Sequence, residues 1–204
     1  MRVEIFDRMD ECTEQEVERL LPLVSEQRRE QALRYKHTVG RFCCLKSWLM
    51  IYDLLDEGMK GLMDEWSYNE HGKPFIHHTP YTIHFSISHC KEGIAVAVDD
   101  QPIGIDIEGI RHAEEDLIER VMNEQERQGM DERKFTRLWT QKEAVVKAQG
   151  VGIVSFEQLQ KILVESGEWK VERYDYLAHH GSDHNYPLST VHYQLLQSSP
   201  PHDA

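Results

Sequence analysis

The sequence predicts an α+β fold, in which long helices and short antiparallel strands occupy the same chain of 204 residues. Apolar residues recur at helical spacing over residues 39 to 56 and 135 to 149. Residues 83 to 108 instead alternate or run apolar and are divided by short turns, which is the pattern of paired strands. The length allows one large domain or two small ones.

The N-terminal third of the chain is expected to be helical. Residues 13 to 35 are expected to hold two helices, because Pro22 interrupts the pattern and Ser25 can cap the second. Residues 39 to 56 follow as one long helix. Residues 57 to 82 are punctuated by glycine and proline and are expected to be rich in loops.

Residues 83 to 108 are predicted to form a three-strand meander. The first and third strands of a meander run the same way, so their ends lie at the same edge of the sheet. The first strand ends at Ser88 and His89, and the third carries Asp106 and Glu108. Topology alone therefore predicts that these four side chains converge.

The C-terminal half of the chain is predicted to hold a helix and a second sheet. Residues 135 to 149 form an amphipathic helix that stops at Gly150. The segment before it is polar and is expected to contain a helix and a mobile loop. That polar segment covers residues 112 to 134. Strands are expected over 151 to 177 and 187 to 197, and a disordered tail over 198 to 204.

Composition argues against several classes of protein. The formal charge of −13 lacks the basic footprint that general nucleic-acid binding needs. No run approaches the length of a transmembrane helix, and residues 1 to 7 lack an apolar signal segment. The four cysteines form no CxxC pair, which fits a reducing cytoplasm. Three histidines without a nearby metal motif are expected to lie in a metal-free loop: His179, His180 and His184.

Acids alternate with isoleucines in residues 103 to 108. On a strand, the isoleucines share one face, and Asp106 and Glu108 share the other. On the helix that follows, Glu143 and Lys147 lie four residues apart and so on one face. Three carboxylates beside a lysine suit Mg²⁺, which usually sits where a substrate brings phosphate. A solvated strand face and a surface ion pair are the alternatives.

Ser88 and His89 are neighbours on a strand, so their side chains point opposite ways and do not form a nucleophile and base. Phosphate binding by the hydroxyl and the imidazole is the functional interpretation, and a structural histidine is the alternative. Lys73 follows Gly72 and precedes Pro74 in a rigid turn, from which it is expected to reach a phosphate.

Four blocks of the sequence, taken together, resemble the 4'-phosphopantetheinyl transferase superfamily. The resemblance is to its longer, pseudo-dimeric type, which activates peptide synthetase and other carrier proteins. The blocks follow the family order and spacing, and Arg41 extends the match toward the N-terminus. They are Gly72-Lys73-Pro74, Phe85-Ser86-Ile87-Ser88-His89, Gly104-Ile105-Asp106-Ile107-Glu108, and Trp139-Thr140-Gln141-Lys142-Glu143 with Lys147.

The resemblance implies two similar α+β halves packed as an intramolecular pseudo-dimer, here residues 1–99 and 100–197, with 198–204 as a tail. It implies transfer of the phosphopantetheine arm of coenzyme A to a serine of an apo acyl or peptidyl carrier protein. The other product is adenosine 3',5'-bisphosphate. The expected protein is a cytoplasmic monomer that requires Mg²⁺, or Mn²⁺ in its place.

The resemblance also assigns roles to individual residues. The implied metal ligands are Asp106, Glu108 and Glu143. Lys147 would steady the pyrophosphate and help protonate the leaving phosphate. Glu143, or a metal-bound water that it orients, is the candidate base. Coenzyme A would bind through Arg41, Lys73, Ser88, His89 and Lys147.

The carrier protein is not specified by the sequence. Carrier proteins are generally acidic, so docking on this acidic chain needs local basic contacts. The basic residues available for it are Arg111, Arg120, Arg127, Arg133 and Lys134. Two rival functions remain: a Mg²⁺-dependent nucleotide pyrophosphate hydrolase, and a non-catalytic module that binds coenzyme A or a carrier protein.

Overall fold

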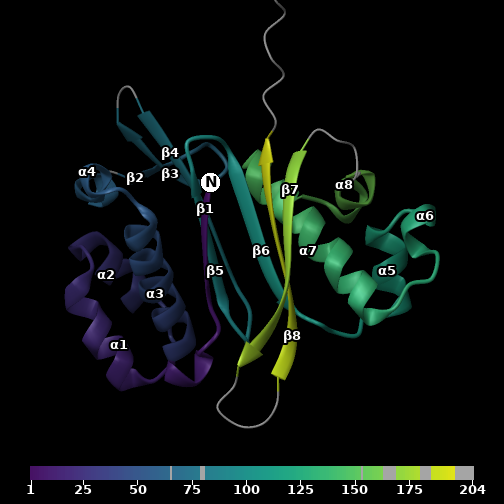
Figure 1. Cartoon of the computed structure of the whole chain (residues 1–204), viewed down its shortest axis with the longest axis horizontal. Coiled ribbons are helices and arrows are strands. Elements are labelled where there is room, and N and C mark those ends of the chain that lie inside the picture. Colours follow the sequence, from purple (N-terminus) through teal and green to yellow (C-terminus); the bar gives the residue numbers. More distant parts are fainter. Residues whose placement is uncertain (65, 79–80, 153, 163–168, 180–184, 196–204) are drawn as a thin grey trace, which may run out of the picture.

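The computed structural model describes residues 1–64, 66–78, 81–152, 154–162, 169–179 and 185–195. Its strands lie in the middle of the molecule, with four helices on one flank and four on the other (Figure 1). The predicted tail over 198 to 204 lies outside the described residues, as do His180 and His184. The helices are α1 (Glu14–Leu20), α2 (Glu26–Leu33), α3 (Thr38–Leu54), α4 (Glu57–Lys60), α5 (Glu115–Val121), α6 (Glu124–Arg127), α7 (Glu132–Gln149) and α8 (Phe156–Lys161).

The first sheet has five antiparallel strands in the order β1-β5-β4-β3-β2. Its long helix is α3, which packs on β1, β4 and β5. The predicted hairpin of the meander is confirmed, because His84 to His89 pair with Asp99 to Ile94. The strands are β1 (Arg2–Phe6), β2 (Trp66–Tyr68), β3 (Pro74–His78), β4 (Tyr81–His89) and β5 (Ile94–Asp99).

The third strand of the predicted meander belongs to a different sheet. Strand β6 (Ile103–Gly109) pairs antiparallel with β8 (Asn185–Leu195), which pairs with β7 (Trp169–His179). The meander is therefore wrong at this strand. The reason is that β5 already has β4 on one edge and β1 on the other, which leaves β6 no edge to join.

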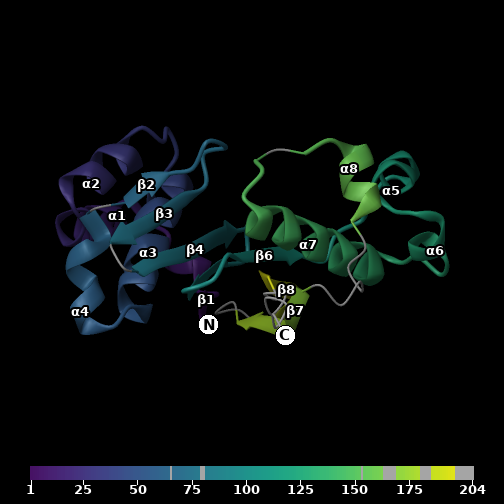
Figure 2. The same ribbon diagram turned by 90° about the horizontal axis from the view of Figure 1, so that it is seen from above.

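Strand β6 nevertheless lies beside β4, as the view from above shows (Figure 2). The isoleucine face predicted for this strand is confirmed: Ile103, Ile105 and Ile107 are buried against Ala95 and Ala97 of β5. The contact between the two sheets is thus made by apolar side chains on one face of β6. The opposite face, which carries the acids, is directed toward α7.

The N-terminal helices begin where the sequence predicts them. Thr13 caps α1 and Ser25 caps α2, each accepting a hydrogen bond from a backbone N–H three residues on. A 3-10 turn at Leu21–Leu23 contains the interrupting proline. Residues 57 to 82 differ from the expected loops, since they include α4 and the short strands β2 and β3. Three-residue β2 is too short to leave an alternating pattern.

Helix α7 packs on β6 and β8 and carries Glu143 and Lys147. It ends at Gly150, whose left-handed φ of 67° matches the predicted stop. Part of the stretch predicted as strand, 156 to 161, is instead helix α8, capped by Ser155. A capping box formed by Ser155 and Gln158 explains the start of this helix. No helix in the described part of the chain is long and apolar enough to cross a membrane.

Candidate active site

A lysine, an aspartate and a serine from three elements meet where β4 lies beside β6. Lys147 Nζ lies 2.6 Å from Asp106 Oδ1, and Ser88 Oγ donates to the same oxygen at 2.7 Å. Ser88 is the penultimate residue of β4, Asp106 lies in the middle of β6, and Lys147 lies in the last turn of α7. The predicted convergence of Ser88 with Asp106 is confirmed, although the two strands belong to different sheets.

The second carboxylate oxygen of Asp106 is buried and has no hydrogen-bond partner among the described residues. Asp106 as a whole is only 4% exposed. A buried oxygen that carries negative charge and lacks a partner is destabilising unless a cation or a donor satisfies it. Asp106 therefore has the properties of a metal ligand, with one oxygen held by protein donors and the other open.

The negative charge of Asp106 affects the pKa values of two further carboxylates, Glu108 and Glu143. Burial raises the pKa of Glu143, and the negative charge of Asp106 raises it further, while Lys147 and Arg111 lower it. Burial and Asp106 raise the pKa of Glu108 in the same way. Burial is the larger cause of both shifts, and the charge of Asp106 adds to it; a bound cation would relieve that repulsion.

Asp106, Glu108 and Glu143 do not form a complete metal-binding group in this structure. Within the described residues, no three His, Cys, Asp or Glu side chains form a group that could hold a metal ion. Here Lys147 is the cation in contact with Asp106. The donor set suits Mg²⁺, which prefers carboxylate oxygen, but Glu108 and Glu143 would have to approach Asp106.

Ser88 and His89 point in opposite directions, as the alternation of a strand predicts. Ser88 is buried at Asp106, and His89 is exposed. Partial desolvation of the imidazole and the positive charge of Lys147 lower the pKa of His89. At neutral pH the ring is therefore uncharged and offers a single N–H donor to an anion.

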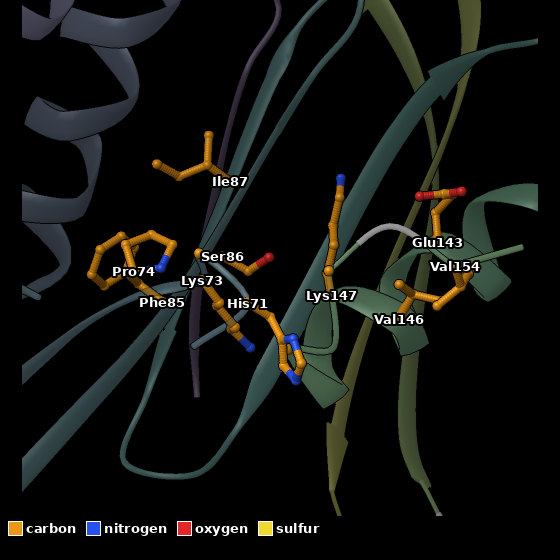
Figure 3. A pocket seen from close by; sticks show the side chains of 13 residues that line it. His71, Lys73, Pro74, Phe85, Ser86, Ile87, Glu143, Val146, Lys147 and Val154 are labelled. Atoms are coloured by element: carbon orange, nitrogen blue, oxygen red, sulfur yellow. The ribbon is translucent and has the colours of Figure 1, made fainter. Parts of the chain in front are cut away.

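A cavity of about 540 Å³ opens beside this cluster. Glu143 and Lys147 extend from α7 in the same direction along its wall (Figure 3). Lys73 lies in the turn before β3 and Ser86 lies on β4, so the cavity lies between the first sheet and α7 (Figure 3). The other lining residues are His71, Gly72, Pro74, Phe85, Ile87, Val146, Gly150, Gly152 and Val154. A size of several hundred cubic ångströms and a largely apolar wall suit a small organic ligand.

Lys73 lines the cavity, but its ammonium group is engaged by the protein backbone. Lys73 Nζ donates to the carbonyl of Ile103 at 2.8 Å and to that of Ala148 at 3.2 Å. Burial lowers the pKa of Lys73 to about 8. The structure thus places this predicted binding residue at the cavity while directing its donors toward β6 and α7.

Arg41 lies apart from the residues that line this cavity in the described part of the chain. Its guanidinium donates to the carbonyl of Tyr35 at 2.9 Å and lies 3.7 Å from Glu14. A second cavity of about 290 Å³ lies next to its helix, lined by Gly40 and by His89 among others. The two cavities share Pro74, Phe85 and Ile87 as walls.

Comparison with known proteins agrees with the four sequence blocks. The model of the 4'-phosphopantetheinyl transferase superfamily matches residues 102–192. The 4'-phosphopantetheinyl transferase psf-1 of Bacillus pumilus is 31% identical over 153 residues, which cover 71% of this chain and 65% of that protein. The chain is thus similar to the 4'-phosphopantetheinyl transferase superfamily over residues 102–192.

Two relatives from Bacillus subtilis align with this chain over three quarters of their own length. The 4'-phosphopantetheinyl transferase ffp of Bacillus subtilis is 29% identical over 78% of this chain and 75% of its own length. The corresponding figures for 4'-phosphopantetheinyl transferase Sfp of Bacillus subtilis strain 168 are 27%, 78% and 75%. These matches agree with the family resemblance drawn from the sequence. The chain spans slightly less than two thirds of the Bacillus pumilus relative.

The superfamily match includes only part of the candidate site. Residues 102–192 contain the acids and the lysine of β6 and α7, but neither Ser88 nor Lys73. Ser88 lies on β4 and Lys73 lies in the turn before β3. The candidate site is thus located at the contact between the matched region and the part of the chain that precedes it.

Two buried cations were not predicted from the sequence. Lys142, which is 1% exposed, donates to the carbonyl of Leu159 and lies 3.0 Å from Glu126. Arg28 is buried and donates to the carbonyl of Cys44. The guanidinium of Arg28 also lies 4.5 Å from the ring of Trp48. Lys142 directly precedes Glu143 on α7, and neighbouring residues of a helix do not share a face. This spacing indicates that Lys142 is not directed to the cavity that Glu143 lines.

Proposed function

We propose that this chain transfers the 4'-phosphopantetheine arm of coenzyme A to a serine of an apo acyl or peptidyl carrier protein. The reaction depends on Mg²⁺ and releases adenosine 3',5'-bisphosphate. The observation that supports it most concerns the two oxygens of the Asp106 carboxylate: one contacts Lys147 and Ser88, and the other is buried with no hydrogen-bond partner among the described residues. This arrangement stands beside a cavity of suitable size for part of the coenzyme.

Asp106, Glu108 and Glu143 are proposed to hold Mg²⁺, with Mn²⁺ as the alternative metal. When bound, the metal would neutralise the pyrophosphate and stabilise the charge that develops on the leaving side. The charge of Asp106 contributes, after burial, to the raised pKa values of Glu108 and Glu143, and this proximity of the three carboxylates supports the assignment. The Asp106 oxygen that has no hydrogen-bond partner among the described residues is proposed as the first metal ligand.

Glu143 is proposed as the base for the serine of the carrier protein. A serine hydroxyl is a poor nucleophile until a base accepts its proton. Burial raises the pKa of Glu143 in the metal-free protein, whereas coordination to the metal would weaken this carboxylate as a base. Glu143 accepts the proton directly or through a water molecule. The serine oxygen then forms its bond to the phosphorus atom that carries the pantetheine arm.

Lys147 is proposed to stabilise the departing phosphate. As the new P–O bond forms, the bond between the two phosphates of coenzyme A breaks, and its electrons pass to the leaving oxygen. Lys147 Nζ lies beside Asp106 and on the cavity wall, so its ammonium is placed to bind that oxygen or to give it a proton. The leaving group is adenosine 3',5'-bisphosphate.

Coenzyme A is proposed to lie along the two adjoining cavities. Lys73 and Lys147 contribute to the wall of the larger one, and Ser88 lies beside Asp106, which Lys147 contacts. His89 lines the smaller cavity, and Arg41 follows Gly40, which lines it too. Placing the nucleotide in one cavity and the pantetheine arm in the other would bring the pyrophosphate to Lys147.

The carrier protein is proposed to dock on the surface formed by residues 111 to 134, where several basic side chains are exposed. Arg111 lies 5.2 Å from the ring of Trp139, and Arg120 lies 4.4 Å from that of Phe156. Both guanidinium groups are thereby held at an exposed surface. The further basic residues proposed for contact with an acidic carrier are Arg127, Arg133 and Lys134.

We also propose that the chain consists of two α+β halves, residues 1–99 and 100–197, arranged as an intramolecular pseudo-dimer. In support, the first sheet uses strands only up to Asp99, and the second begins at Ile103. Each sheet is packed by one long helix, α3 or α7. A monomer in the cytoplasm is the corresponding expectation for the whole protein.

The test is to incubate the purified protein with coenzyme A, Mg²⁺ and a panel of apo carrier proteins and to weigh each carrier by mass spectrometry. A gain of one phosphopantetheine arm, abolished by a chelator, is the expected result. Release of adenosine 3',5'-bisphosphate without any carrier would instead favour a pyrophosphate hydrolase. Binding of coenzyme A without transfer to any carrier would favour a non-catalytic module.

A further inference from the structure

The turn between β2 and β3 is fastened to the two elements that carry the reactive side chains. Lys73 Nζ donates to the carbonyl of Ile103, the first residue of β6, at 2.8 Å. The same nitrogen donates to the carbonyl of Ala148, in the last turn of α7, at 3.2 Å. One ammonium group from the first sheet therefore bridges the start of β6 and the end of α7.

Asn69 adds a second bond from the same turn. Asn69 Nδ2 donates to the carbonyl of Gly150 at 2.9 Å. Its Oδ1 accepts hydrogen bonds from the backbone N–H groups of Lys73 at 2.8 Å and of His71 at 3.0 Å. Asn69 thus shapes the turn from which Lys73 extends and also attaches that turn to the residue that caps α7.

These bonds satisfy groups that a helix leaves open. The last carbonyls of a helix lack intrahelical partners, and their negative potential favours a cation. Lys73 supplies that cation from another part of the chain. Burial lowers the pKa of Lys73 to about 8, but a neutral amine still has two N–H groups for the two carbonyls. The bridge therefore persists in either protonation state.

The bridge stands next to the catalytic residues in sequence. Ala148 directly follows Lys147, and Ile103 precedes Asp106 by three residues. Between these points α7 and β6 are in very close contact, since a Cβ on Gly104 would lie 2.0 Å from the carbonyl oxygen of Ala144. The bridge thus fixes the end of α7 at the crossing that sets the distance from Lys147 to Asp106.

We propose that the Lys73 ammonium is a positioning group that, with Asn69, holds Lys147 against Asp106, and that it does not bind a phosphate of coenzyme A. This inference rests on the proposed transferase function for its kinetic test. It differs from the expectation drawn from the sequence, in which this lysine reaches a phosphate. Lys73 still lines the cavity through its aliphatic stem.

The variants that test it are Lys73→Met, which keeps the stem without the donors, and Asn69→Ala, which removes a bond of the same turn without changing charge. Lys161→Met, at a lysine 71% exposed on α8, controls for the loss of one positive charge. We expect kcat to fall about tenfold to a hundredfold in Lys73→Met and in the same direction in Asn69→Ala. The Kd for coenzyme A, from calorimetry, should change by less than about threefold.

Hydrogen exchange supplies a readout that does not need turnover. Backbone amides over residues 146 to 150 should exchange faster in both variants than in the wild type and in Lys161→Met. Failure of the wild type to modify any carrier would refute the transferase function, while the exchange result would still decide the bridge. If Lys73→Met does not fold, Asn69→Ala carries the same comparison.

The opposite pattern would overturn the inference. A rise of tenfold or more in the Kd for coenzyme A in Lys73→Met, with kcat unchanged and Asn69→Ala like the wild type, would make Lys73 a phosphate ligand. Unchanged exchange and unchanged kcat in both variants would show that the bridge has no influence on Lys147.

Discussion

Lys147 and Asp106 form an ion pair of 2.6 Å across the contact between α7 and β6. The Asp106 side chain is 6% exposed and that of Lys147 is 29% exposed, so the pair is closed on one side and open to the cavity on the other. Ser88 binds the same oxygen of Asp106, which leaves the second oxygen for a cation. A single carboxylate thus connects the proposed metal to the proposed acid.

Lys147→Ala is expected to reduce kcat by about two orders of magnitude and the affinity for coenzyme A by less. The reason is that its ammonium acts mainly on charge that appears as the pyrophosphate bond breaks. Steady-state kinetics and calorimetry with coenzyme A measure the two effects separately. A large loss of affinity with kcat preserved would make Lys147 a binding residue only.

Glu108→Gln and Glu143→Gln are each expected to stabilise the metal-free protein at neutral pH. The pKa of both carboxyls is raised in the folded state, so folding favours their protonated forms. Their contribution to stability is complete below the unfolded pKa of about 4.5 and is lost as the pH rises through the raised pKa. Denaturant unfolding should therefore favour the variants at neutral pH and show no gain near pH 4.

Addition of Mg²⁺ should make the wild type more stable than Glu108→Gln and Glu143→Gln. Bound metal stabilises the ionised carboxylates, so it should raise the unfolding midpoint of the wild type more than that of either variant. Equal shifts for wild type and variants would remove Glu108 and Glu143 from the proposed ligand set. Glu57→Gln, at a glutamate 89% exposed on α4, is the matched control.

Gly104→Ala is expected to destabilise the fold by about 2 kcal/mol or more, because the new methyl group would meet the backbone of α7. Loss of transfer should accompany it, since α7 has to move away from Asp106. Gly58→Ala is the control: its added methyl would have no neighbour within 4 Å, and it lies in α4. Thermal unfolding measures both. Equal stability of Gly104→Ala and the wild type would contradict the close contact.

Lys142→Met is expected to lower the free energy of unfolding by about 3 kcal/mol or more. It would leave Glu126 without its cation and the carbonyls of Leu159 and Ile162 without a donor. Lys161→Met, at an exposed lysine, should change stability by less than about 0.5 kcal/mol. Similar denaturation midpoints for the two variants would show that Lys142 is replaceable.

The acidic face of β6 could be predicted from sequence because strand alternation is local. Asp106 and the buried isoleucines follow directly from a period of two. The pairing of β6 could not be predicted in the same way. It depends on β1 occupying the free edge of β5, a contact between residues more than eighty positions apart, such as Val3 and Ala97.

The direction of the Lys73 ammonium group is a second feature that the sequence alone does not predict. Its place in a rigid turn was visible in the sequence, and the structure has it at the cavity. The direction of its ammonium depends on where that turn lies relative to α7 and β6, which no local pattern records. The same holds for Lys142, whose partners are carbonyls of a segment about twenty residues away.

The most direct test of the account compares phosphopantetheine transfer by the wild type and by Asp106→Asn, which preserves shape but removes the charge. Carrier mass would be followed at saturating coenzyme A, with Mg²⁺ and with a chelator. The account predicts a gain of one phosphopantetheine arm for the wild type with Mg²⁺ alone, and about a hundredfold slower transfer by a folded Asp106→Asn. Near-normal transfer by Asp106→Asn, or by the wild type in chelator, would contradict it.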